Sequence, residues 1–174
     1  SVLQRDNWLK LFGQYVHISH VFDEATGKKT GEKRIIFPRY HQWHAVESAA
    51  KAIQFEGSKN NRLFQHSAGS GKSNTISWLA YTLSTLHSPD ADNIGQLLRD
   101  EGFGPNEPLF NKVIIVTDRR VLDKQLRDTV SSFDHQPGSI VSINEELGSK
   151  NVQLKVALES NASRIIITTL QTFP

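Results

Sequence analysis

The sequence has 174 residues, with 20 Lys and Arg, 18 Asp and Glu, and no cysteine. This length suits one compact domain with its own core. The missing cysteines exclude disulfides, zinc–thiolate sites and cysteine nucleophiles, and a formal charge of +2 does not by itself indicate nucleic-acid binding. No apolar run approaches the roughly 20 residues of a membrane-spanning helix, and no signal peptide is visible. We therefore expect a soluble protein, and a reducing, cytoplasmic setting is compatible with the composition.

Residues 1–35 predict a lead-in segment, which we interpret as a linker from an upstream domain. A first helix is indicated by the apolar residues Trp8, Leu9, Leu11 and Phe12. The polar stretch 23–33, "DEATGKKTGEK", indicates a turn.

From residue 36 onward, helical and strand patterns alternate. Apolar residues recur at helical spacing over 43–53, 76–86, 122–133 and 154–158. Continuous β-branched runs of strand length lie between them, namely "KVIIVTD", "SIVSI" and "RIIITT". Strands that are apolar on both faces and alternate with amphipathic helices predict an α/β fold. We expect a mostly parallel sheet with helices on both faces, joined by right-handed crossovers.

The stretch 88–111 breaks this alternation, because it is rich in proline, glycine and mixed charge. Such a composition predicts a surface insertion. The main domain is accordingly expected to span residues 36–174, with this insertion inside it.

The stretch 63–76, "LFQHSAGSGKSNTI", has the composition of a phosphate-binding loop between a strand and a helix. Glycines let backbone amides face an anion, a lysine neutralises the β and γ phosphates, and a hydroxyl binds Mg²⁺ at the positive end of the helix. The nucleotide-binding candidates are Ala68, Gly69, Ser70, Gly71, Lys72, Ser73 and Asn74. Lys72 and Ser73 are also the catalytic candidates, with Ser73 as the Mg²⁺ ligand. The usual pattern has another glycine where His66 or Ser67 stands, and the alternative is a plain glycine turn.

Four stretches in this order resemble the first motor lobe of the restriction subunit (HsdR) of type I restriction-modification systems: "FPRYHQWHAV", "QHSAGSGKSNTISWLA", "VIIVTDRRVLDKQL" and "IIITTLQTFP". The resemblance covers most of residues 36–174 and is weakest over 88–111. It implies a RecA-like lobe of the P-loop NTPase fold within helicase-like superfamily 2, with ATP and Mg²⁺ as cofactors. It also implies double-stranded DNA and the methyltransferase and specificity subunits as partners. Relatives in this superfamily often carry a non-glycine residue at the position of His66.

The stretch "RYHQ" resembles the Q motif, in which a glutamine amide reads the adenine edge through its donor and acceptor together. This resemblance assigns Gln42 to the adenine, with Arg39 and Tyr40 as neighbours. The alternative is an exposed polar residue that opens a helix. His41 and His44 lack a third ligand, so we interpret them as surface or core residues.

Two further stretches resemble the DNA-contacting motifs Ia and Ib of this superfamily. The residues that the resemblance assigns to the DNA backbone are Thr117, Arg119, Gln125, Thr168, Thr169 and Gln171. Both stretches follow strands, so a parallel sheet would place them at its carboxyl edge. Contacts to phosphates position a duplex without reading its sequence. The alternative is that Asp118 caps the next helix and the arginines are solvated.

ATP hydrolysis requires an acid pair that holds magnesium and orders water, and none follows a strand before Pro174. The second lobe's arginine fingers and a nuclease constellation are also not found. We therefore expect a partial lobe that binds nucleotide and touches DNA without completing a cycle. In the intact subunit the resemblance implies an ATP-dependent type I site-specific deoxyribonuclease that translocates along DNA. The open alternatives are another superfamily 2 helicase or remodeller, an unrelated P-loop enzyme such as a kinase, and a DNA-binding module without nucleotide.

Overall fold

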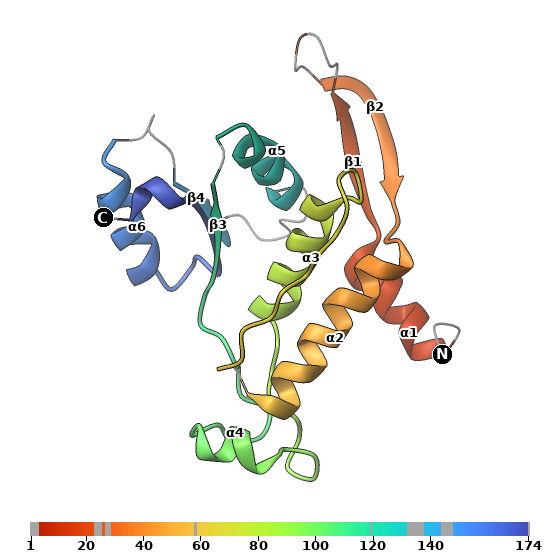
Figure 1. The fold of residues 1–174 in the computed structure, drawn as a ribbon, viewed down its shortest axis with the longest axis vertical. Coiled ribbons are helices and arrows are strands. Elements are labelled where there is room, and N and C mark those ends of the chain that lie inside the picture. The colour runs from red at the N-terminus through yellow and green to blue at the C-terminus, as the bar shows by residue number, and fades with distance from the viewer. Residues whose placement is uncertain are drawn as a thin grey trace. The chain divides into compact units, whose positions relative to one another are not determined.

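The computed structural model describes residues 4–22, 26, 29–57, 59–118, 120–131, 138–143 and 148–173. The chain forms two compact units, Ser1–Tyr40 and His41–Pro174 (Figure 1). Among the described residues, no helix combines the length and the apolar character needed to cross a membrane.

The first unit begins with α1 (Arg5–Lys10), which continues into a π-helical turn, η1 (Leu11–Tyr15). The first helix expected from the sequence is thus confirmed. Three aromatic rings line up in this unit. Trp8 stacks on Phe12 with ring centroids 5.3 Å apart, and Phe12 meets Phe37 edge-on at 6.4 Å.

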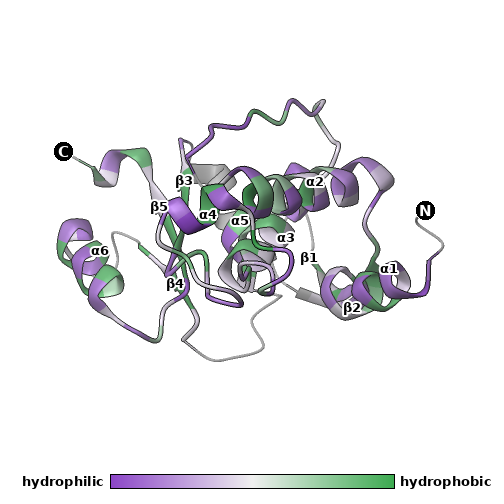
Figure 2. Ribbon diagram, turned by 90° about the horizontal axis from the view of Figure 1, so that it is seen from below, coloured by the Kyte–Doolittle hydropathy of each residue, from purple (hydrophilic) through white to green (hydrophobic). Residues whose placement is uncertain are grey.

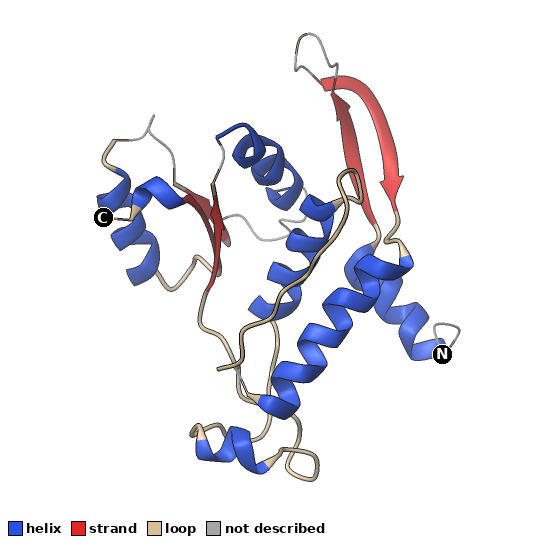
Figure 3. Ribbon diagram, viewed as in Figure 1, coloured by secondary structure: helices blue, strands red, loops and turns tan. Residues whose placement is uncertain are grey.

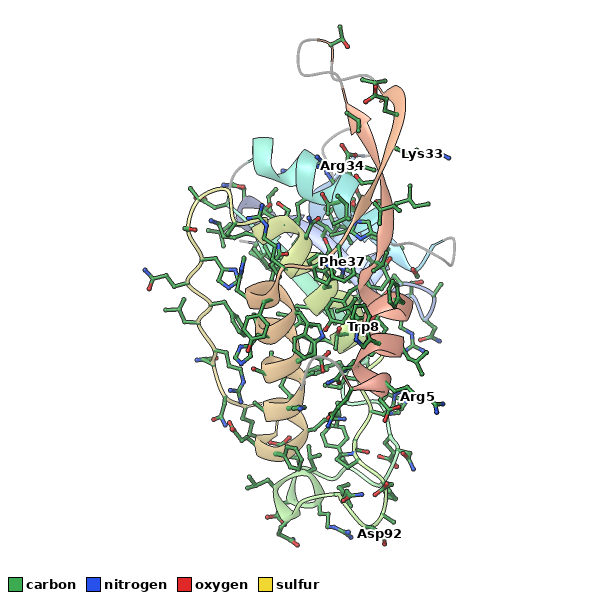
Figure 4. All side chains as sticks on the ribbon, turned by 90° about the vertical axis from the view of Figure 1, so that its right-hand side faces the viewer. Arg5, Trp8, Lys33, Arg34, Phe37 and Asp92 are labelled. Atoms are coloured by element: carbon green, nitrogen blue, oxygen red, sulfur yellow. The ribbon has the colours of Figure 1, made fainter. Side chains whose placement is uncertain are left out.

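A two-stranded antiparallel ribbon follows, built from β1 (His17–Phe22) and β2 (Lys29–Ile36) (Figure 3, red). The interpretation of 23–33 as a turn was therefore wrong in part, since β2 already begins at Lys29. The polar residues of β2 showed no alternation of apolar and polar residues, because both faces of the strand are exposed here. Lys33 and Arg34 are both exposed, and their side chains leave β2 on opposite sides (Figure 4). Cross-strand backbone hydrogen bonds, which no side-chain pattern reveals, hold the ribbon together.

The second unit contains the predicted alternation of helices and strands. Its elements in chain order include α2 (Tyr40–Glu56), α3 (Lys72–Ser84), β3 (Val113–Thr117), α5 (Arg120–Ser131), β4 (Ile140–Ser142), α6 (Lys150–Glu159), β5 (Ile165–Thr169) and the 3₁₀ turn η3 (Leu170–Thr172). The helices expected from the apolar spacing and the strands expected from the β-branched runs are confirmed.

The sheet is parallel, with the strand order β3-β5-β4. Successive strand residues point to opposite faces, so β5 supplies both halves of the core. Figure 2 shows the sheet between α6 on one side and α3 and α5 on the other. One face packs against α3 and α5 through Ala80, Ile115, Leu126, Val130, Ile165 and Ile167. The other face packs against α6 through Ile143, Leu154, Ala157 and Ile166. The predicted α/β fold, with helices on both faces of a parallel sheet, is confirmed.

The apolar run ahead of the phosphate loop does not form the strand that the sequence suggested. Residues 59–67 are loop, and the side chains of Leu63 and Phe64 are 89% and 40% exposed. A strand needs a neighbour to satisfy its backbone, and in the described part of the chain β3 pairs with β5 alone. The run at Leu63 therefore does not join the open edge of β3, and no described strand pairs with it.

The stretch 88–111 folds into a small appendage that includes α4 (Gln96–Asp100). Its apolar centre is formed by Ile94, Leu98 and Leu109, against which Ile53 of α2 and Leu86 also pack. Ser88 ties the stretch together, because its hydroxyl donates to the Gly104 carbonyl at 2.6 Å. The appendage thus packs against the carboxyl end of α2 and the residues that follow α3.

Candidate nucleotide-binding site

The glycine loop turns onto α3 through two left-handed residues. Gly69 has φ +72° and Gly71 has φ +80°, which lie in a region of backbone conformation that residues other than glycine rarely adopt. A Cβ atom at Gly71 would lie 2.5 Å from Nε2 of Gln42, whereas one at Gly69 would meet nothing within 4 Å. The loop is therefore packed tightly on one side at Gly71 and has open space at Gly69.

The loop leads directly into the amino end of α3, which is the positive end of the helix dipole. Gly71 is the N-cap of α3, and being glycine it has no side chain to cap the first amides. The first turn, Lys-Ser-Asn-Thr, holds no acidic residue that would neutralise the dipole. In Figure 1 this loop leads into the upper end of α3, the side toward which β3 also runs. An anion at this point would meet unpaired amides and a positive dipole.

Lys72 lies across the loop. Its exposed ammonium donates to the carbonyl of Ser67 at 2.8 Å and to that of His66 at 3.2 Å. Because an ammonium has three donors, it can hold both carbonyls and still meet a phosphate oxygen. The structure therefore places the predicted phosphate lysine on the loop that it would serve.

The serine side chains of the loop also fit a bound oxyanion. In the part of the chain that the structure describes, the buried hydroxyl of Ser70 has no hydrogen-bond partner. A buried hydroxyl left unsatisfied costs about 1–3 kcal/mol, so a loop carrying one fits a ligand that supplies an oxygen. Ser73 is half-buried in the first turn of α3, where a hydroxyl ligand for Mg²⁺ belongs, while Ala68 is exposed and Asn74 is half-buried.

Gln42 faces the loop from the first turn of α2. Its side chain is 3% exposed, and Nε2 donates to the carbonyls of Ser70 at 3.1 Å and Gly71 at 3.0 Å. The alternative of an exposed polar residue is thereby excluded. Adenine recognition by Gln42 stays a prediction, because the amide nitrogen holds the loop in this structure. Arg39 is exposed and belongs to the first unit, and its role at the site also stays a prediction.

Sequence reasoning missed His41 as a site residue. Its Nε2 lies 3.3 Å from the Ser70 carbonyl, and its ring meets the His66 ring edge-on with centroids 5.2 Å apart. The sequence placed His41 beside Gln42, but nothing in the helical pattern indicated that it would reach the loop.

The two stretches assigned to DNA lie together at the carboxyl edge of the sheet, as predicted. Thr117 at the end of β3 pairs in register with Thr169 at the end of β5. Beyond the strands, the exposed Gln171 donates to the Asp118 carbonyl at 3.4 Å, and the Thr117 hydroxyl donates to the Thr168 carbonyl at 3.4 Å. The edge therefore presents Gln171 and the half-buried Thr117.

Two of the predicted DNA contacts are turned inward. Thr168 and Thr169 are 0% and 4% exposed, and both hydroxyls bond the Thr172 hydroxyl, at 2.9 and 3.4 Å. Contact with a phosphate would require Thr172 to release them. Arg119 lies outside the described residues, as does the side chain of Gln125 in α5.

A parallel sheet covered by helices on both faces, with a glycine loop and lysine at the amino end of a helix, defines a partial RecA-like lobe of the P-loop NTPase class. The family model of the SWI2/SNF2 ATPases matches residues 41–174. The chain belongs to the SWI2/SNF2 ATPase family, and this part of it is a helicase-like motor lobe. The match begins at His41, where the second compact unit begins. Comparison with curated proteins and with solved structures gave no match.

Proposed function

We propose that this chain is the nucleotide-binding part of an ATP-dependent DNA translocase motor in a type I restriction subunit. The phosphate loop supports nucleotide binding, because Lys72, two left-handed glycines and the amino end of α3 converge there. The type I assignment rests on the four sequence stretches in order. DNA cleavage then belongs to a nuclease domain outside this chain.

The residues of the loop bind and orient the triphosphate. The amides from Gly69 to Ser73 would hold its oxygens, Lys72 would neutralise the β and γ phosphates, and the Ser73 hydroxyl would hold Mg²⁺. Mg²⁺ held there would supply positive charge against the phosphate oxygens. Positioning at this loop is the contribution of this chain.

The carboxyl edge of the sheet is proposed to contact duplex DNA. Gln171 is exposed there, and Arg119 lies between β3 and α5 in the sequence. Such contacts position the motor on the phosphate backbone and carry no sequence information. Recognition of a DNA sequence falls to the specificity subunit that, with the methyltransferase subunit, completes the proposed cytoplasmic complex.

The family match favours a second candidate, a SWI2/SNF2-type remodeller or helicase that moves on DNA without cleaving it. Incubating the intact protein and its partner subunits with ATP and unmethylated plasmid distinguishes the two. ATP-dependent linearisation that methylation prevents supports the restriction subunit. ATP hydrolysis with DNA translocation and no cleavage supports the remodeller.

Nucleotide binding is tested by thermal unfolding of the chain with Mg²⁺ and a non-hydrolysable ATP analogue. A ligand at about 100 times its dissociation constant stabilises the folded state by about 2.7 kcal/mol. We expect a rise in melting temperature that Lys72→Ala abolishes. Lys155→Ala is the matched control, since Lys155 is an exposed lysine on α6. Equal rises for the wild type and Lys72→Ala would contradict the assignment.

A further inference from the structure

Two histidines beside the phosphate loop have no part in the proposed function. His66 stands where the usual phosphate-loop pattern has a glycine, and His41 precedes Gln42. Their rings meet edge-to-face, with centroids 5.2 Å apart and an interplanar angle of 89°. This is a favourable geometry for an aromatic pair.

His41 contacts the loop at a second point. Its Nε2 is 3.3 Å from the Ser70 carbonyl, and because a carbonyl only accepts, the Nε2 atom carries the proton in this contact. His66 opens the loop and Ser70 precedes its final glycine. His41, fixed in the first turn of α2, therefore holds the loop near both of its ends.

The position of His66 is connected to that of the phosphate lysine. The His66 carbonyl accepts one of the two hydrogen bonds that hold the Lys72 ammonium, at 3.2 Å. Gln42, the neighbour of His41, holds the carbonyls of Ser70 and Gly71 from the same turn of α2. A shift of the His66 backbone would therefore change where Lys72 points.

We propose that His41 and His66 are positioning residues that form a brace between α2 and the phosphate loop and fix the loop in the shape that takes a triphosphate. The inference rests on the proposed nucleotide binding. Where a loop carries a glycine at the position of His66, flexibility allows the approach of the phosphate. Here His66 stands in place of that glycine, and its ring contact with His41 holds the loop in one shape before the ligand binds. Holding the loop in advance lowers the entropic cost of binding.

The test is a double-mutant cycle on nucleotide affinity. Dissociation constants for the Mg²⁺ complex of an ATP analogue are measured by calorimetry for the full chain, for His41→Ala, for His66→Ala and for the double variant. We expect each single change to raise the dissociation constant. The rise in the double variant should be about threefold to tenfold smaller than the product of the two single rises, which corresponds to the energy of an edge-to-face pair. If the rise in the double variant equals the product of the two single rises, the two histidines act independently and the inference is wrong.

Conservative variants separate the ring contact from the hydrogen bond. His66→Phe keeps the ring and should bind nearly as the wild type does, whereas His66→Gly restores the usual glycine and should bind more weakly. His41→Phe keeps the ring but loses the donor, and should fall between the wild type and His41→Ala. If His66→Gly binds as tightly as the wild type, the brace is not needed and the inference is wrong.

A purely structural role is excluded by measuring the melting temperature without nucleotide. His87→Ala is the control, because His87 is an exposed histidine that bonds the Thr85 carbonyl at 2.8 Å. We expect the brace variants to melt slightly below His87→Ala, because the ring contact is present without ligand, and to bind nucleotide more weakly at temperatures where they are fully folded. Losses of affinity that occur only where a variant is already partly unfolded would overturn the positioning role. A wild-type chain that binds no nucleotide would contradict the proposed function itself, which is a separate result.

Discussion

Gly71 meets two requirements that only glycine satisfies together. Its φ of +80° is left-handed, and its missing side chain leaves room for Nε2 of Gln42. We expect Gly71→Ala to destabilise the chain by more than the roughly 1–2 kcal/mol of left-handed strain alone. Gly69→Ala is the matched control, since Gly69 has φ +72° but open space around it. Urea denaturation compares the two variants, and equal losses would mean that the Gln42 contact adds no constraint.

A substitution at Gln42 distinguishes two roles for its side-chain amide, which are to hold the loop carbonyls and to recognise the adenine base. Because Nε2 donates to two loop carbonyls, Gln42→Ala leaves the carbonyls of Ser70 and Gly71 without these donors. A lost buried hydrogen bond costs about 1–3 kcal/mol, so we expect weaker binding of ATP and GTP alike, by about tenfold. Competition titrations with both nucleotides measure this. A loss confined to ATP would show that Gln42 acts on adenine and not through the loop.

At the scale of elements, Lys112 joins the start of β3 to the end of α6. Its ammonium donates to the Ser163 carbonyl at 2.8 Å and also to the Ser160 carbonyl, at the C-cap of α6. A cation is favourable at this negative end of a helix. We expect Lys112→Met to lower the free energy of unfolding by about 1.5–3 kcal/mol.

The measurement for Lys112 is the midpoint of urea denaturation. Lys155→Met serves as the control, because Lys155 is an exposed lysine on the same helix, α6. Lys112→Arg keeps the charge and should recover part of the loss. A Lys112→Met midpoint equal to that of Lys155→Met would show that the contact contributes nothing to stability.

The elements also show where sequence patterns predict structure and where they do not. The run "VIIVT" became β3 because β5 lies beside it in register. The run at Leu63 and Phe64 has a similar apolar start but no strand beside it in the described residues, and it stayed loop. Strand β2 formed from polar residues because β1 was near in sequence. Pairing is a non-local interaction, so the composition of a single segment cannot determine it.

At the scale of the whole molecule, the proposed DNA contacts are tested by the salt dependence of DNA affinity. Each phosphate neutralised by a cation contributes about 0.9 to the slope of log affinity against log salt. We expect Arg119→Ala to flatten this slope by about one unit in the intact protein, and Gln171→Ala to weaken affinity without changing the slope. Neither change should alter the preference among DNA sequences.

The salt titration uses the intact protein on duplex DNA, with Lys155→Ala as a charge-matched control on α6. Thr168→Ala is not informative about DNA, since its buried hydroxyl bonds Thr172 and its loss would reduce stability first. If Arg119→Ala leaves both affinity and slope unchanged, that arginine is a solvated surface residue and the DNA lies elsewhere.

The sequence by itself determined the helices that flank the sheet, the strands of the sheet and the glycine turn into α3, because the spacing of apolar residues and the glycines encode local backbone preferences and burial. Only the tertiary structure decided the partners of individual polar groups. It turned Gln42 and His41 onto the loop carbonyls, and it directed the hydroxyls of Thr168 and Thr169 toward Thr172. The physical reason is distance: Gln42 and Ser70 are 28 positions apart in the chain. No local pattern records which donor will reach which carbonyl across such a separation.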